Sequence, residues 1–180
     1  MGKVINVRGL AIGEGRPKIC VPIVAADMEG ALIQAEKIRQ LPADLVEWRV
    51  DHMEEIWDTE VLIQAAAALR EALGDLPLLA TIRTTREGGE AELCEHGYEK
   101  QVQNLIASGS IDLIDIEISR EPHRIARTIE AARENQVAVI MSSHDFEKTP
   151  DVREMVTRLY ARKQMGPDIA KLEVMPHTRS

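Results

Sequence analysis

The chain has 180 residues, of which 44% are hydrophobic and 29% charged, so it can bury a core, and we expect one domain spanning residues 1–180. Its net charge of −8 offers no basic face for nucleic acid or an anionic membrane, and a small acidic substrate would need locally placed arginines. With no apolar run of ~18 residues, no signal-peptide pattern and no Cys-x-x-Cys spacing, the chain is expected to be cytoplasmic and free of disulfides.

Short β-branched segments alternate with amphipathic helical segments along the chain. A weakly specified strand or hairpin is expected over residues 4–12, where it could cover the N-terminal mouth of a barrel. Six strands follow, at residues 18–24, 45–50, 76–84, 112–118, 137–143 and 169–175. Five helices separate these strands, and the first two are expected to begin at Asp27 and at Asp58 or Thr59.

Strict alternation of strands and helices indicates parallel strands joined by helical crossovers, in either an open doubly wound sheet or a barrel. A doubly wound sheet would be expected to carry a glycine-rich phosphate loop after its first strand, and residues 24–28 contain no glycine. Charged residues instead occupy the C-terminal ends of nearly all the strands, which is where barrel enzymes have their active sites. The sequence therefore predicts a TIM (β/α)8-type barrel with only about six βα units, hence incomplete or open.

Side-chain alternation within these strands predicts that several charged residues point into the barrel. The inward set comprises Glu47, Arg49, Asp51, Thr81, Arg83, Asp115, Glu117, Ser142, His144, Lys171 and Glu173. Unpaired, such groups would cost several kcal/mol each on burial, so they form either a mutually neutralising network or a hydrated pocket. A pocket is the simpler account, although a Glu47–Arg49 ion pair across the barrel is an equal alternative for those two residues.

Two residues of this set carry the most chemical information. His144 and Lys171 both lie where an apolar strand ends, so a base and an amine could meet over one bound carbonyl. This pairing suggests Schiff-base chemistry.

Four segments together resemble type I 3-dehydroquinate dehydratase: EWRVDH (47–52), TIRTTREGGE (81–90), SHDFEKTP (143–150) and AKLEVMP (170–176). The resemblance runs through all 180 residues, in order and at the family's spacing. It implies a (β/α)8 barrel, usually a homodimer, that converts 3-dehydroquinate to 3-dehydroshikimate in the shikimate route to aromatic amino acids. The partner implied is this small-molecule substrate, with no nucleic acid, no membrane, no metal and no organic cofactor.

The resemblance also implies a role for each matching residue. Lys171 matches the family's Schiff-base lysine, His144 its general acid and base, and Glu87 the carboxylate that works with the histidine. Groups that bind the substrate's hydroxyls and carboxylate are matched by Glu47, Arg49 and Arg83. A keto group condensed with the lysine becomes an iminium, which makes the neighbouring proton removable at neutral pH.

Two departures from the family pattern bear on activity. The family continues into a seventh and an eighth strand, whose loops supply a further arginine and a lid carrying serine and glutamine, and none of these follows residue 176 here. We therefore expect an incomplete substrate clamp and two unpaired sheet edges that invite self-association. In addition, Glu173 stands where a small residue is expected, and its carboxylate would oppose attack by Lys171 unless Arg49 or Arg83 neutralises it.

Two other interpretations remain open. The chain could be a catalytically impaired homologue that keeps the fold and acts at most as a ligand-binding or assembly protein. It could also be another barrel enzyme that forms a lysine imine, such as an aldolase, which would explain Lys171 but neither the EWR nor the REGG segment.

Overall fold

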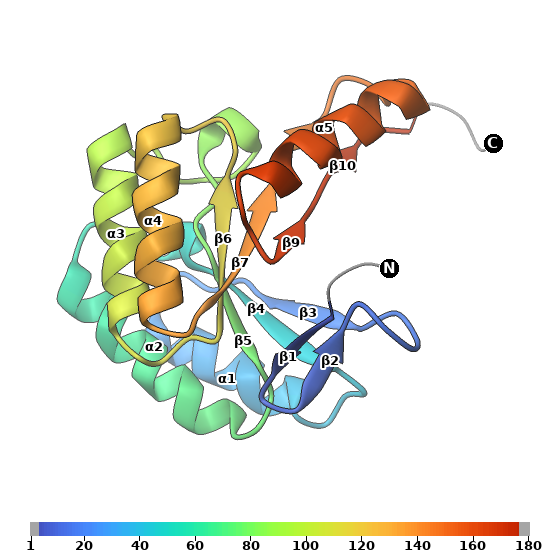
Figure 1. The fold of residues 1–180 in the computed structure, drawn as a ribbon. Coiled ribbons are helices and arrows are strands. Elements are labelled where there is room, and N and C mark those ends of the chain that lie inside the picture. The colour runs from blue at the N-terminus through green and yellow to red at the C-terminus, as the bar shows by residue number, and fades with distance from the viewer. Residues whose placement is uncertain (1–3, 177–180) are drawn as a thin grey trace.

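The computed structural model describes residues 4–176 and is built around a six-stranded parallel sheet (Figure 1). Its strands lie in the order β3 (Cys20–Ile23), β4 (Leu45–Arg49), β5 (Leu78–Thr81), β6 (Leu113–Glu117), β7 (Ala138–Ser142) and β9 (Ile169–Ala170). Neighbouring strands are parallel throughout the sheet, so all their C-terminal ends lie at one rim. The predicted parallel architecture is thereby confirmed.

Five helices connect the strands: α1 (Met28–Ile38), α2 (Thr59–Leu73), α3 (Glu95–Ala107), α4 (Pro122–Glu134) and α5 (Val152–Gln164). The side chain of Asp27 caps α1 by accepting a hydrogen bond from the Gly30 amide at 2.7 Å. Asp58, rather than Thr59, caps α2. No helix within residues 4–176 is both long enough and apolar enough to cross a membrane.

The main core lies between the helices and the outer face of the sheet. Trp48, Ile114 and Ile116 point from β4 and β6 into this layer, where they meet helix residues such as Leu62 and Leu69 of α2. Full burial of one such side chain stabilises the fold by about 1.5–3 kcal/mol. Because alternate strand residues point the opposite way, the charged positions of the same strands face the barrel interior.

A β-hairpin covers the end of the sheet at which the strands begin, opposite the rim formed by their C-terminal ends, as predicted for residues 4–12 (Figure 1). Strands β1 (Ile5–Val7) and β2 (Leu10–Ile12) pair antiparallel, and the inward side chains of β1 join a second apolar cluster. That cluster contains Ile5, Val7, Leu45, Leu79, Leu113 and Ile140. Apolar side chains thus line the N-terminal mouth of the barrel, whereas the charged strand residues lie towards the C-terminal rim.

The barrel does not close within the described residues, because β3 and β9 each pair on one side only. The predicted open barrel is therefore confirmed. The sixth predicted strand, residues 169–175, is divided into β9 and β10 (Glu173–Val174), and β10 pairs with the short strand β8 (His144–Asp145). Backbone hydrogen bonds from Lys171 N to Met141 O and from Glu173 N to Ser143 O, both 2.9 Å, continue through the division.

The observed strands end one or more residues before the predicted ends, and short 3₁₀ turns follow the second and the third strand. The second strand ends at Arg49 and runs into the turn η1 (Val50–His52), while the third ends at Thr81, before the turn η2 (Thr85–Glu87). Asp51 consequently does not share the inward face of β4. It is buried and bound to Arg49, so it belongs to a neutralising network and does not line the cavity described below.

Candidate active site

One polar cavity of about 280 Å³ opens at the C-terminal rim of the sheet. All six site residues predicted from the sequence line it: Glu47, Arg49, Arg83, Glu87, His144 and Lys171. Glu173 and Phe146 complete the wall beside the histidine and the lysine. The amine and the imidazole that we expected to meet over one carbonyl therefore open into the same space.

His144 is oriented by a carboxylate. Its Nδ1 lies 2.8 Å from Glu87 Oε2, while Ser119 Oγ donates to Glu87 Oε1 at 2.8 Å. A carboxylate at Nδ1 favours the tautomer with its proton on that nitrogen, which leaves Nε2 free to accept one. The Phe146 ring stacks on the imidazole with centroids 6.0 Å apart, and together these contacts hold the ring in one orientation.

The ionised form of Glu87 is favoured in the folded protein. Burial alone raises the pKa of Glu87, but hydrogen bonds with His144 and Ser119 and the charge of Arg83 outweigh burial and lower that pKa below its ordinary value. A carboxyl group whose pKa is lowered on folding stabilises the protein above its unfolded pKa. That stabilisation is lost as the pH falls through the folded pKa.

Replacing Glu87 with glutamine is therefore expected to lower the free energy of unfolding by about 1–3 kcal/mol at pH 5.5. The difference from the wild type should shrink steadily as the pH falls towards 3, which urea denaturation at several pH values measures. Glu130→Gln, which removes an exposed carboxylate on α4, provides a matched control with a small, nearly constant effect. A Glu87→Gln difference that grows on acidification would contradict the assignment.

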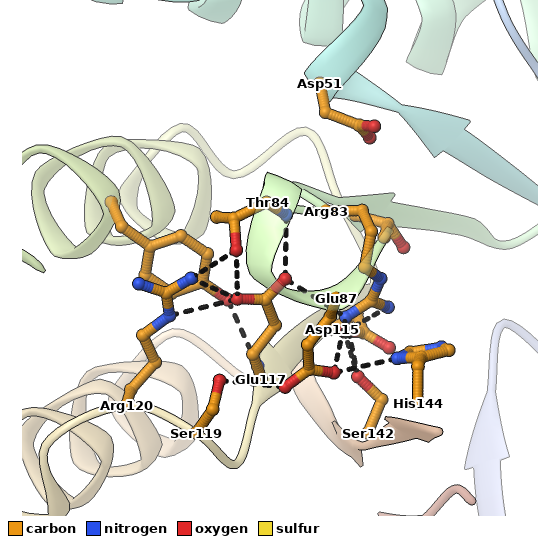
Figure 2. A network of polar contacts seen from close by, with 12 residues as sticks. Asp51, Arg83, Thr84, Glu87, Asp115, Glu117, Ser119, Arg120, Ser142 and His144 are labelled. Carbon is orange, nitrogen blue, oxygen red and sulfur yellow. Dashed lines mark hydrogen bonds and ion pairs between the residues drawn. The ribbon is translucent and has the colours of Figure 1, made fainter. Parts of the chain in front are cut away.

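Arg83 lies at the centre of a buried polar network (Figure 2). It donates from Nη2 to Asp115 Oδ1 at 2.8 Å and from Nη1 to Ser142 Oγ at 2.9 Å, and Glu117 lies 3.5 Å from Nη1. Burial raises the pKa of Asp115 even though the charge of Arg83 and the Ser142 hydroxyl oppose this. Some of the inward charged residues thus form a neutralising network beneath the pocket, while others line the pocket.

Glu117 anchors the turn that carries Glu87 (Figure 2). Its carboxylate accepts from the backbone amide and the hydroxyl of Thr84 at 2.7 and 2.8 Å and from Arg120 Nε at 3.0 Å. The Arg120 guanidinium also lies 4.3 Å from the centre of the Tyr98 ring. This network holds η2 against β6 and so positions Glu87 towards His144.

The two remaining predicted residues on β4 are bound separately. Glu47 accepts a hydrogen bond from Thr81 Oγ1 at 2.7 Å. Arg49 binds Asp51 through two parallel hydrogen bonds of 2.9 and 2.7 Å, a fork that limits its motion. The possible Glu47–Arg49 ion pair is therefore replaced by these two contacts, and both side chains still face the cavity.

The glycines of the REGG segment allow the η2 loop to fold back on β5. A Cβ on Gly89 would lie 2.1 Å from the carbonyl oxygen of Arg83, and Gly88 adopts a left-handed φ of +76° beneath the Phe146 ring. Only glycine fits both requirements without displacing the backbone.

Substitution of Gly89 by alanine is expected to destabilise the protein by about 1–3 kcal/mol, because the new methyl group overlaps backbone that cannot move away. The thermal unfolding midpoint should fall accordingly. For Gly97→Ala on α3, where the nearest atom to a new Cβ is 3.5 Å away, no loss is expected. Equal midpoints for the two variants would contradict the close approach at Gly89.

Lys171 reaches the cavity from the division between β9 and β10. Its Nζ lies 2.5 Å from Glu173 Oε1, and Glu173 Oε2 lies 3.4 Å from His144 Nε2. Burial raises the pKa of Glu173, but the hydrogen bond and charge of Lys171, followed by the charges of His144 and Arg83, lower it overall. One carboxylate therefore contacts both reactive groups, so the amine and imidazole lie within the span of one small molecule.

A second cavity, of about 450 Å³, lies at the other mouth of the sheet, between residues 12–18 and the strands. Its floor consists of apolar strand residues such as Leu45, Leu113 and Ile140, and it contains no histidine or carboxylate from the predicted set. Within residues 4–176, no group of three His, Cys, Asp or Glu side chains could hold a metal ion. The polar cavity is thus the candidate active site.

Some contributors to this site were not predicted from the sequence. Ser119 orients Glu87, and Phe146 stacks on His144. Ser119 follows Asp115 and Glu117 at alternate positions, so the same period-two pattern could have indicated it. The contact of Phe146 depends on a loop conformation for which the sequence carries no comparable signal.

Comparison with known proteins gives a consistent result. A family model described as type I 3-dehydroquinase matches residues 19–180. A 3-dehydroquinate dehydratase from Bacillus licheniformis is 40% identical over 178 residues, which is 99% of this chain and 70% of that protein.

Solved structures agree with the sequence matches. Type I 3-dehydroquinate dehydratase from Clostridium difficile superposes with a TM-score of 0.96 at 35% identity, covering 99% of this chain and 70% of that one. The 3-dehydroquinate dehydratase from Enterococcus faecalis gives 0.94 at 38% identity, with coverage of 97% and 72%. The family model, these relatives and the shared fold show that the chain belongs to the type I 3-dehydroquinase family.

Proposed function

We propose that this protein is a 3-dehydroquinate dehydratase, a carbon–oxygen lyase that forms 3-dehydroshikimate through a Schiff base on Lys171. The observation that carries the proposal is the shared cavity, in which a lysine amine, a carboxylate-held imidazole and two arginines face one another. The family membership established above supports the substrate. The aldolase alternative loses support, because the EWR and REGG residues also line or shape this cavity.

Each step of the proposed reaction has a group available for it. The free amine of Lys171 attacks the keto carbon of the substrate, water leaves, and the resulting iminium withdraws electrons from the adjacent carbon. His144 Nε2 removes a proton from that carbon, and its imidazolium then returns a proton to the departing hydroxyl, which leaves as water. Hydrolysis of the imine releases the product and restores the amine.

Substrate binding is proposed to involve the side chains on β4 and just beyond β5. Arg49 and Arg83 supply positive charge for a carboxylate, and Glu47 can accept a hydrogen bond from a substrate hydroxyl. Asp51 and Asp115 hold the two guanidinium groups in place, so they serve as positioning residues.

A direct test is the appearance of conjugated-enone absorbance when purified protein is mixed with 3-dehydroquinate. We expect turnover by the wild type and a loss of about 10²–10⁴-fold in His144→Ala, because proton transfer by a positioned base contributes that much. His123→Ala removes an exposed histidine on α4 and should leave turnover unchanged. Equal turnover by His144→Ala and wild type would exclude His144 as the base.

The alternative is a catalytically impaired homologue that binds the substrate without converting it. The observation that favours it is the open sheet, whose β3 and β9 edges are unpaired in residues 4–176. Under this alternative the enone signal would be absent while 3-dehydroquinate still raises the thermal unfolding midpoint. Under the dehydratase proposal both signals are present.

We further propose a homodimer, a cytoplasmic location and a single functional domain over residues 1–180. Within residues 4–176 the β3 and β9 edges are unpaired, and such edges favour pairing with another chain, which supports self-association. The location follows from the proposed role in aromatic amino acid biosynthesis. The main core joins residues from Ile23 to Met141 in one cluster, which supports a single domain.

A further inference from the structure

Glu173 stands between the two groups that the proposed reaction needs. Its backbone is paired in register with His144, and Glu173 N donates to Ser143 O at 2.9 Å. Its carboxylate contacts Lys171 Nζ through Oε1 at 2.5 Å and His144 Nε2 through Oε2 at 3.4 Å. The register of β8 and β10 therefore delivers this side chain to the space over both reactive nitrogens.

Both contacts occupy the nitrogens that the proposed reaction uses. The Glu173 carboxylate binds Nζ, the atom that must attack the keto carbon of the substrate. At His144, Glu87 already occupies Nδ1, and Glu173 covers the nitrogen that must remove the substrate proton. Any substrate that spans the amine and the imidazole must occupy the position of this carboxylate.

The two carboxylates that contact His144 differ in exposure and in their other contacts. The Glu87 side chain is buried and is held by Ser119, whereas the Glu173 side chain is 48% exposed and contacts only Lys171 and His144 among the described hydrogen bonds and ion pairs. Glu173 can thus move out of the cavity without disturbing the core. Glu87 cannot.

We propose that Glu173 is an internal inhibitory group, whose carboxylate holds Lys171 and covers His144 until substrate displaces it. The inhibitory role rests on the proposed function, but the effect of Glu173 on the reactivity of Lys171 can be measured without the substrate. Other charged groups near the pair are Asp115 on β6, whose charge interacts with Lys171, and Arg83, whose charge interacts with Glu173. Asp115 and Arg83 are both retained in a variant that changes Glu173 alone.

The test compares the reactivity of Lys171 in the wild type and in Glu173→Gln, which keeps the side-chain shape and removes the charge. Full-length protein is treated at pH 7 with formaldehyde and cyanoborohydride, and methylation of each lysine is followed by peptide mass spectrometry. We expect Lys171 to be methylated several-fold faster in Glu173→Gln, because the amine is no longer held in a charge-assisted hydrogen bond with the carboxylate. Glu130→Gln removes one exposed charge elsewhere and should leave the rate unchanged.

An equal rate of Lys171 methylation in the folded wild type and Glu173→Gln proteins would overturn the proposal. Circular dichroism verifies folding, and the exposed side chain makes the substitution compatible with the fold. A second readout is the reaction with 3-dehydroquinate, where Glu173→Gln should lower KM several-fold because the substrate no longer displaces a bound carboxylate. A higher KM in Glu173→Gln would instead make Glu173 a substrate-binding residue and refute the inhibitory role.

The two proposals fail in different ways. If Lys171 methylation is faster in Glu173→Gln but neither protein produces the enone, the result supports restraint of Lys171 by Glu173 and contradicts the dehydratase function. If the enone forms and the methylation rates are equal, the function stands and the inhibitory role of Glu173 fails.

Discussion

Replacing Lys171 with alanine is expected to reduce turnover of 3-dehydroquinate on the order of 10⁴-fold or more. Without the amine no iminium forms, so the proton next to the keto group keeps its low acidity and the remaining base is insufficient. The side chain reaches the cavity from a hydrogen-bonded backbone position, and Lys171 N still donates to Met141 O when the side chain is shortened. The loss should therefore appear in kcat, with the fold intact.

The matched control for this variant is Lys100→Ala, which removes an exposed lysine from α3. Steady-state kinetics by enone absorbance should give wild-type turnover for Lys100→Ala, and denaturation should give similar midpoints for both variants. If Lys171→Ala kept more than about a tenth of the wild-type kcat, the reaction would not proceed through this lysine.

The largest effect on stability is expected at Arg83. Its guanidinium is 4% exposed and faces Asp115 at 2.8 Å, with Glu117 and Glu87 3.5 and 3.8 Å away. Arg83→Met leaves buried Asp115 without its cation and removes a second cation from Glu117 and Glu87, and breaking a buried pair in this way costs about 3–5 kcal/mol. Urea denaturation should show a lower midpoint with an unchanged slope.

Arg86→Met is the comparison variant, because it shows how much stability is lost when the arginine removed is exposed rather than buried. Arg86 pairs with Glu95 at 2.8 Å, but its side chain is 60% exposed, so the loss should be below about 1 kcal/mol. Both variants exchange the same residue types, but Arg83→Met removes contacts with buried carboxylates, whereas Arg86→Met removes an exposed ion pair. Equal losses of stability at the two positions would show that the buried network under the pocket contributes no more to the free energy of unfolding than an exposed ion pair does.

The fold was largely predictable because its signals are local. Strand alternation requires only a period of two, and it correctly predicted that Arg83, His144 and Lys171 point to the inward side of the sheet, where they line one cavity. The capping aspartate before α1 and the apolar hairpin at the N-terminus were also readable from short segments. Parallel pairing then brings the C-terminal strand ends together without further information.

The parts that could not be predicted depend on contacts between distant segments. The strand before Asp51 ends early because the 3₁₀ turn η1 replaces its last predicted residue, and that turn is bonded to a distant loop through the hydrogen bond from Glu90 N to Asp51 at 3.3 Å. Sequence reasoning anticipated the proximity of Glu173 to Lys171, which are two residues apart. It did not anticipate the contact with His144, because that contact depends on the register between β8 and β10.

The central claim is that Lys171 and His144 act on one substrate in a common cavity, and borohydride reduction during turnover tests it most directly. Protein mixed with 3-dehydroquinate and then reduced should carry one covalent adduct, located by peptide mass spectrometry on Lys171. The adduct should also form in His144→Ala, where the imine can still arise while proton removal is slow. An adduct on another lysine, or continued enone formation with no reducible adduct, would contradict the account.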